Sequence, residues 1–281
     1  MDNYPFSIIN SSMPSFKCPH CDLPLALESR SYRCENNHTY DVAREGYVNL
    51  LLSQHKKSRN PGDSKEMIDS RQRFLNKGYY QILADAIAPL VQADERVLDI
   101  GCGEGYYMAQ LRQAMPSLQL AGIDMSKTAV ILAAKRKMDA QLAVISAYAL
   151  PFFDGVFETA VSIFSPISPA ETARVLGENG RVIMVGPGGE HLRGLASQIY
   201  DEIVPHEGNH SVLDEASEFT LQSQLEIKET ITVAGEDVHD LLMMTPYYWH
   251  TKPEQQEKLA NLPQLETTIH FYINEYRVAR V

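Results

Sequence analysis

Short apolar runs alternate with longer amphipathic segments through the middle of this chain, between residues 79 and 187. The apolar runs predict buried strands, and the segments between them, where apolar residues recur at helical spacing, predict helices. We expect strands over 95–100, 118–123, 141–145, 156–163 and 180–186, and helices over 80–92, 104–115, 126–137 and 169–176. Strands that alternate with helices form a mainly parallel sheet covered on both faces, an α/β, Rossmann-like fold class.

The C-terminal third has a weaker pattern. Residues 191–206 have a helical spacing of apolar positions, and 225–233 and 269–273 are typical of strands. The alternation of Ile269, Phe271 and Ile273 predicts that the last strand is the one antiparallel edge strand of the sheet. The segment MMTPYYWH at 243–250 is rich in aromatic residues, which more often pack in a core than stack on nucleic-acid bases.

The segment VLDIGCGEGYY at 97–107 combines an apolar strand, a glycine-rich turn and the start of a helix. Gly101, Gly103 and Gly105 let the backbone approach a ligand closely, and the amides of the turn favour electronegative groups. Asp124 follows Gly101 by 23 residues, at the end of the next strand, where an acidic side chain meets ribose hydroxyls in nucleotide-binding sheets. We expect a nucleoside-containing cofactor here, and the absence of the GxGxxG spacing disfavours a nicotinamide dinucleotide.

Three of the four cysteines lie close together with a histidine near the N-terminus. Cys18 and Cys21 form a CxxC pair, and Cys34 and His38 follow as C-x3-H. This spacing can close a tetrahedron of ligands around Zn²⁺, and four protein ligands make the site structural, with no open coordination position. The alternative is two disulfides or idle thiols, but Cys102 belongs to the glycine turn and disulfide frameworks are typical of small secreted proteins.

Composition places the chain among ordinary globular proteins, with 44% hydrophobic and 22% charged residues in 281. Its net charge of −11 argues against a polyanionic partner until the distribution is considered. Residues 1–80 hold 11 of the 25 lysines and arginines and 9 of the 36 acidic residues, which gives this part +2 and the remainder −13. We expect no membrane partner and a cytoplasmic location, because neither a spanning apolar run nor a signal peptide is recognisable.

The excess of basic residues is concentrated in one stretch. Residues 54–63 are polar, basic and broken by a Pro-Gly pair, which predicts a loop, and Asp63 or Ser64 can then cap a helix that reaches Asn76. Charged residues of this kind can form a solvated face, but a flexible basic loop between a zinc site and a cofactor domain is also placed to hold a polyanion. The candidate RNA-binding residues are Lys56, Lys57 and Arg59.

The chain therefore divides into three predicted parts. A zinc-binding domain covers residues 1–45, a basic loop and linker helix cover 46–78, and the cofactor-binding domain covers 79–281.

The sequence SAYALPF at 146–152 resembles the adenine-binding loop of class I S-adenosylmethionine (SAM) methyltransferases, although Ser146 stands where an acidic residue is common. The spacing from Asp99 through Gly105 also resembles their glycine loop. The resemblance implies a class I methyltransferase fold, with SAM as cofactor. It further implies SAM contacts from Asp99, Gly101, Gly103, Glu104, Gly105, Tyr106, Asp124, Met125, Ser146, Ala147 and His191.

Taken in order, CPHC, CENNHTYDVAREGYVNLL, HKKSRNPGDSKEM, VLDIGCGEGYY and MTPYYW resemble the RlmA family of bacterial 23S rRNA guanine-N1 methyltransferases nearly end to end. The resemblance implies zinc on Cys18, Cys21, Cys34 and His38, and 23S rRNA as partner. It implies methylation at N1 of one guanine in a hairpin loop of domain II, at guanine 745 or the neighbouring guanine 748. A homodimer would be one way to build a larger basic groove.

Guanine N1 carries a proton and must lose it to act as a nucleophile, so a general base or a group that stabilises O6 is expected. The sequence does not single one out. Ser165 after the fourth strand, His191 and His250 are candidates, and each is more often a structural residue in such a position. Two other functions fit parts of the sequence: a small-molecule SAM methyltransferase, and a zinc-ribbon RNA-binding protein without activity.

Overall fold

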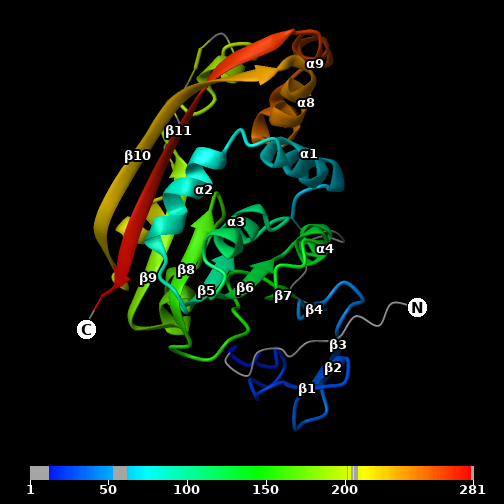
Figure 1. The fold of residues 1–281 in the computed structure, drawn as a ribbon, viewed down its shortest axis with the longest axis vertical. Coiled ribbons are helices and arrows are strands. Elements are labelled where there is room, and N and C mark those ends of the chain that lie inside the picture. Colours follow the sequence, from blue (N-terminus) through cyan, green and yellow to red (C-terminus); the bar gives the residue numbers. More distant parts are fainter. Residues whose placement is uncertain (1–12, 53–61, 201, 204, 206–207, 280–281) are drawn as a thin grey trace.

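The computed structural model describes residues 13–52, 62–200, 202, 203, 205 and 208–279, and Figure 1 shows their arrangement. Two sheets are present in this part of the chain. A small antiparallel sheet has the order β1-β2-β3, and a large sheet has the order β10-β11-β9-β8-β5-β6-β7-β4. The small sheet consists of β1 (Ala26–Glu28), β2 (Ser31–Arg33) and β3 (Thr39–Asp41).

The large sheet is parallel from β4 to β9 and carries the predicted doubly wound pattern. Its parallel strands are β4 (Tyr47–Asn49), β5 (Arg96–Ile100), β6 (Gln119–Asp124), β7 (Ala140–Val144), β8 (Phe157–Ile163) and β9 (Leu176–Pro187). The central strands are buried along almost their whole length, which is typical of a sheet covered on both faces. The predicted Rossmann-like architecture is confirmed, and β4 adds an edge strand within a segment predicted to be loop and linker.

The expectation of an antiparallel edge strand at the C-terminus is wrong in one respect. The last strand, β11 (Gln264–Val278), is antiparallel to β9, but β10 (Phe219–Ala234) pairs with its other side and forms the edge. Most of β11 is buried whereas most of β10 is exposed, so the burial pattern follows this order. Both strands are much longer than predicted because they form one long ribbon, visible in Figure 1.

The helices α2 (Gln81–Ile87), α3 (Tyr106–Ala114), α4 (Lys127–Lys135) and α5 (Pro169–Val175) lie where the sequence pattern predicts them, and a 3-10 turn, η2 (Ala88–Leu90), continues α2. The hydroxyl of Ser168 caps α5 by accepting from the amide of Glu171. The carboxylate of Glu171 binds Arg174 and the Leu150 amide. The helix expected over 191–206 is reduced to α6 (Arg193–Ala196), and α7 (Ser211–Asp214) follows.

A second group of helices lies beyond the carboxyl ends of the strands (Figure 1). It consists of α1 (Lys65–Asn76), capped by Ser64, one of the two caps predicted for it, and of α8 (Gly235–Met243), η3 (Pro246–His250) and α9 (Pro253–Ala260), which connect β10 to β11. Ion pairs hold α1 to α8: Arg73 binds Asp240, with 2.9 Å from Nε to Oδ2, and Lys77 binds Asp237 and Glu236. Because Asp237 and Asp240 are largely buried, these pairs fix the relative position of the two helices.

The described residues of the predicted zinc-binding domain, 13–45, form an N-terminal unit that packs on the large sheet. Phe16 lies 5.2 Å from the Tyr32 ring and 5.3 Å from the Phe152 ring, between ring centroids, and the Lys17 amide donates to the Pro151 carbonyl at 2.8 Å. The unit therefore shares a hydrophobic core with one face of the sheet. Among the described residues, no helix combines the length and the apolar character that crossing a membrane requires.

Candidate functional site

A cavity of about 660 Å³ lies at the carboxyl ends of the parallel strands, below α1 and the connection from α8 to η3. Its volume falls within the range of small-molecule and cofactor sites, about 300–1,000 Å³. Many predicted residues line it: Asp99, Gly101, Gly103, Glu104, Tyr106, Asp124, Met125, Ala147, Ser165 and His191. The fold thus brings most of the predicted cofactor residues and two of the candidate catalytic residues to one cavity.

The glycine turn after β5 forms one wall of this cavity. Gly101 has φ +79°, and a Cβ built on it would lie 1.8 Å from the Ser165 Oγ, so only glycine fits. Gly103 has φ +54° and nothing within 4 Å of such a Cβ, which leaves open space for a ligand. A cradle of this kind fits the adenosyl and methionine groups of SAM, with Asp99 and Asp124 beside it.

A buried carboxylate, Asp99, and a half-buried one, Asp124, lie in the cavity wall. Burial and the neighbouring Asp124 raise the pKa of Asp99 to about 7. Burial also raises the pKa of Asp124, although the amides of Ser126 and Gly103 donate to its carboxylate at 2.7 and 3.0 Å and oppose that shift. A positively charged ligand would relieve the repulsion between the two acids. This electrostatic environment suits a cationic sulfonium cofactor.

Glu104, which the resemblance places in contact with SAM, has a carboxylate that is already paired. Arg136 Nε donates to Glu104 Oε2 at 2.9 Å, and the Glu104 side chain is 1% exposed. The pair joins the glycine turn to the end of α4. Glu104 therefore stabilises the turn, while Asp99 and Asp124 carry the unpaired acidity of the site.

Three predicted residues are not in the cavity wall. Gly105 caps α3, and its Cα faces Ala133, so its role is packing between α3 and α4. The Ser146 Oγ accepts from the Tyr148 amide at 3.2 Å and closes the turn after β7, which leaves Ala147 and Tyr148 to face the cavity. His250 is exposed on η3.

His191 lines the cavity, but its ring is held from both sides. Its Nδ1 accepts from the His270 amide at 3.3 Å, and its Nε2 lies 3.4 Å from the Tyr80 hydroxyl. Because a backbone amide can only donate, this arrangement requires a neutral ring with the proton on Nε2. The geometry therefore favours a positioning role over proton abstraction by His191.

Sequence reasoning missed several cavity residues. Phe164, Tyr107, Asn209 and Arg71 all line the cavity, and the hydroxyl of Tyr107 is buried with no hydrogen-bond partner among the described residues. Arg71 donates to the Met244 carbonyl at 3.4 Å and binds Asp63. These residues carry no motif of their own, and only the fold brings them to the cavity.

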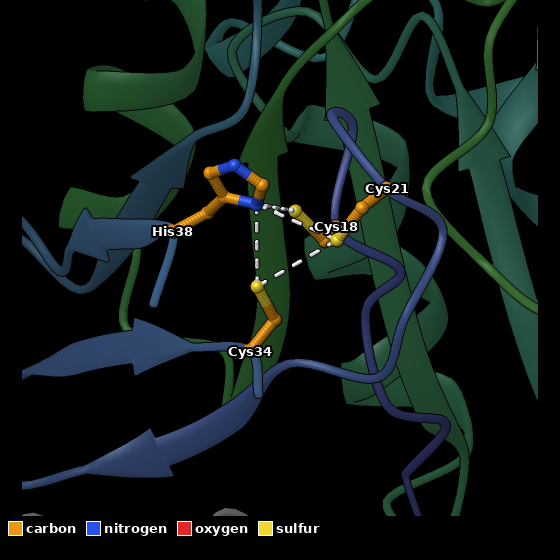
Figure 2. Close-up of side chains that lie close together, drawn as sticks. All are labelled: Cys18, Cys21, Cys34 and His38. Carbon is orange, nitrogen blue, oxygen red and sulfur yellow. Dashed lines mark hydrogen bonds between the residues drawn. The ribbon is translucent and has the colours of Figure 1, made fainter. Parts of the chain in front are cut away.

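The predicted zinc ligands converge in the N-terminal unit, as Figure 2 shows. The ligand atoms of Cys18, Cys21, Cys34 and His38 all lie within 4.8 Å of one another. His38 Nδ1 is 3.4–3.5 Å from the three sulfurs, and the sulfurs of Cys21 and Cys34 are 3.7 Å apart. Bonds of about 2.3 Å to sulfur and about 2.1 Å to nitrogen give tetrahedral edges of about 3.5–3.8 Å, so the donor set fits Zn²⁺. All four cysteines are unpaired by disulfides.

The structure describes only a small part of the basic stretch 54–63. Lys56, Lys57 and Arg59 lie outside the described residues. The basic residues that follow this loop, Lys65, Arg71, Arg73 and Lys77, all pair with acidic side chains of this chain. Arg73 and Lys77 pair with α8 and hold α1 in place, whereas the partners of Lys65 and Arg71 lie within α1 or just before it; this use of basic residues was not anticipated from their sequence.

Comparison with known proteins finds matches to both the zinc-binding part and the cofactor-binding part of the chain. A family model described as RlmA, N-terminal, a zinc ribbon, matches residues 16–59, and a methyltransferase domain model matches residues 97–189. A 23S rRNA (guanine(748)-N(1))-methyltransferase from Streptomyces fradiae is 32% identical over 256 residues, which cover 88% of this chain and 90% of the relative.

A relative from Bacillus subtilis (strain 168) is 30% identical over 268 residues, 90% of this chain and 94% of its own length, and bears a provisional name as a 23S rRNA (guanine-N(1)-)-methyltransferase. Among solved structures, the [4+2]-cyclase SpnF is similar with a TM-score of 0.50 and 16% identity, covering 80% of this chain and 100% of that chain. At this identity the likeness concerns the fold alone.

Proposed function

This chain belongs to the RlmA family of 23S rRNA (guanine-N1)-methyltransferases, and we propose that it transfers a methyl group from SAM to N1 of a guanine in 23S rRNA. The observation that carries the proposal is the continuity of the cavity at the carboxyl ends of the strands. Its wall runs from the glycine turn after β5 to the ends of β8 and β9, so a cofactor and a flipped base can meet in it.

SAM, when bound, supplies an activated methyl group on its sulfonium. The work of the chain is then to hold a base in line with that methyl group and to deal with the N1 proton. Ser165 lines the cavity directly beside the glycine turn, so it is our candidate for a contact with the base near the cofactor. His191 would position the neighbouring aromatic residues.

Guanine N1 lies on the Watson–Crick edge, so the target base must be unpaired or flipped. We place it in a hairpin loop of domain II of 23S rRNA, at guanine 745 or at guanine 748; the latter is the target in the name of the S. fradiae relative. The zinc-binding unit and the loop with Lys56, Lys57 and Arg59 would hold the RNA backbone. Two copies of the chain in a homodimer would extend this basic surface.

A single assay distinguishes this function from the two others considered, a small-molecule SAM methyltransferase and an inactive RNA-binding protein. The protein is incubated with radiolabelled SAM and unmodified 23S rRNA, with a mixture of small-molecule acceptors as the second arm. Label in the rRNA supports the proposal. Label only in small molecules indicates a small-molecule methyltransferase, and binding of rRNA without any transfer indicates an inactive RNA-binding protein.

A further inference from the structure

Asn209 lies directly over the end of β9. A Cβ built on Gly186 would be 2.0 Å from the Asn209 Oδ1, a distance that no side chain allows. The absence of a side chain at Gly186 therefore lets the amide of Asn209 reach the cavity wall, where Asn209 is found. Gly186 itself lies on a buried strand.

The Asn209 Oδ1 is buried, and no group among the described residues donates a hydrogen bond to it. A buried amide oxygen without a donor is unfavourable, and native structures rarely leave one unless a ligand or water satisfies it. The Asn209 side chain lines the cavity that the proposed function fills with a guanine, and its Oδ1 is packed against Gly186 at the cavity wall. A rotation of the amide toward the cavity would bring this oxygen to a hydrogen-bond donor of the substrate.

Phe164 follows the last residue of β8 and lies beside Gly186 of the neighbouring strand β9. Ile163 is the register partner of Val185, and the Phe164 amide donates to the Val185 carbonyl at 3.0 Å, so Phe164 is adjacent to Gly186. Its φ of +55° is unfavourable for a bulky residue, and strain of this kind is typical of functional sites. Phe164 is 40% exposed and lines the cavity, and its ring packs against Phe271 with centroids 5.5 Å apart.

We propose that Phe164 and Asn209 form the guanine subsite, in which the Phe164 ring stacks on the base and the Asn209 Oδ1 accepts from the exocyclic 2-amino group. The inference rests on the proposed function. An amide oxygen is too weak a base to remove the N1 proton, so its natural partner is a donor that keeps its hydrogen during the reaction. The 2-amino group is that donor, and it is absent from adenine.

The test uses an rRNA hairpin in which the methylated guanosine, once mapped, is replaced by inosine, which lacks only the 2-amino group. The wild-type protein should methylate guanosine with a kcat/KM about tenfold to a hundredfold higher than inosine. Asn209→Ala should lower the value for guanosine to about that for inosine, and SAM affinity should stay unchanged. Retention of the preference by Asn209→Ala, or equal use of both bases by the wild-type protein, overturns the proposal.

Two further variants separate recognition from folding. Phe164→Leu should raise KM for both hairpins, whereas Phe164→Tyr, which keeps the ring, should retain most activity. Gly186→Ala should displace Asn209 and abolish the guanosine preference, and Gly186→Ala combined with Asn209→Ala should be no worse in discrimination than Asn209→Ala alone. If the wild-type protein methylates no rRNA guanine at all, the proposed function fails and this subsite falls with it, a result distinct from a retained preference.

Discussion

The hydroxyl of Ser165 occupies the space that a side chain on Gly101 would need, with 1.8 Å between its Oγ and the position of a Cβ. The glycine turn after β5 and the loop after β8 are therefore in contact at the centre of the cavity. This contact joins the cofactor half of the cavity to the half that would receive the base. A side chain added at Gly101 would push the glycine turn and the loop after β8 apart.

The first prediction concerns Gly101→Ala. The collision with Ser165, together with a left-handed φ that costs an alanine about 1–3 kcal/mol, should weaken SAM binding at least about tenfold, as measured by calorimetric titration. Gly78→Ala is the matched control, because Gly78 has φ +83° and no atom within 4 Å of a built Cβ. The control should lose stability without losing SAM affinity. Wild-type affinity in Gly101→Ala would contradict this description of the turn.

The second prediction is a pH dependence of SAM binding. The pKa of Asp99 is raised to about 7 from its usual value of 3.8, so ionisation of Asp99 opposes folding of the cofactor-free protein. The free energy of unfolding of the cofactor-free protein should therefore fall as pH rises from 3.8 to about 7, and it should level off above pH 7. A cationic cofactor favours the ionised acid, so SAM affinity should increase about tenfold from pH 6 to pH 8.

Asp99→Asn is the control for this dependence, since it removes the titrating group and leaves the amino group of SAM, which also titrates. The variant should bind SAM weakly and with a much flatter pH profile. A profile as steep as that of the wild-type protein would assign the dependence to another group.

Local sequence patterns predicted the elements that depend on local information. The α/β alternation, the cap of α1 at Ser64 and the zinc ligand set all follow from spacing, and the structure agrees with each. The order of β10 and β11 was not predictable, because it depends on which strand pairs with β9 across nearly 80 residues of chain. Asn209 and Phe164 were missed for the same reason: they line one cavity only because β8 and β9 pair.

The third prediction concerns removal of zinc. The amide of Lys17 donates to Pro151, and Phe16 packs on Phe152, so the zinc-binding unit braces the loop that presents Ala147 to the cavity. Chelation should unfold the unit, whose small size makes its folding dependent on the metal. It should therefore weaken SAM binding by about threefold to tenfold, since a braced loop becomes mobile.

Cys34→Ser should reproduce the effect of the chelator, and adding the chelator to Cys34→Ser, the control for effects of the chelator outside the zinc cluster, should change SAM affinity no further. Restoring Zn²⁺ to the chelated protein should restore SAM affinity. Unchanged SAM affinity in the zinc-free protein would show that the loop holds its shape without the unit.

The fourth prediction concerns the basic loop. Replacing Lys56, Lys57 and Arg59 with alanine should weaken binding of the rRNA hairpin and should reduce the slope of log affinity against log salt by about 2 to 3, because each cation releases counterions from one phosphate. SAM affinity should stay near that of the wild-type protein. Lys228→Ala, on the exposed edge strand β10, is the control and should leave both quantities nearly unchanged. Wild-type RNA affinity in the triple variant would remove this loop from the RNA-binding surface.

The most direct measurement of the central claim is to identify the methylated nucleoside and its position. Unmodified 23S rRNA is treated with the protein and SAM, digested for mass spectrometry of its nucleosides, and mapped by primer extension, which stops at a base methylated on its Watson–Crick edge. The predicted result is N1-methylguanosine at a single stop in the domain II hairpin, at guanine 745 or 748. A methyl group on another atom or another base, or no modified nucleoside at all, would contradict the account.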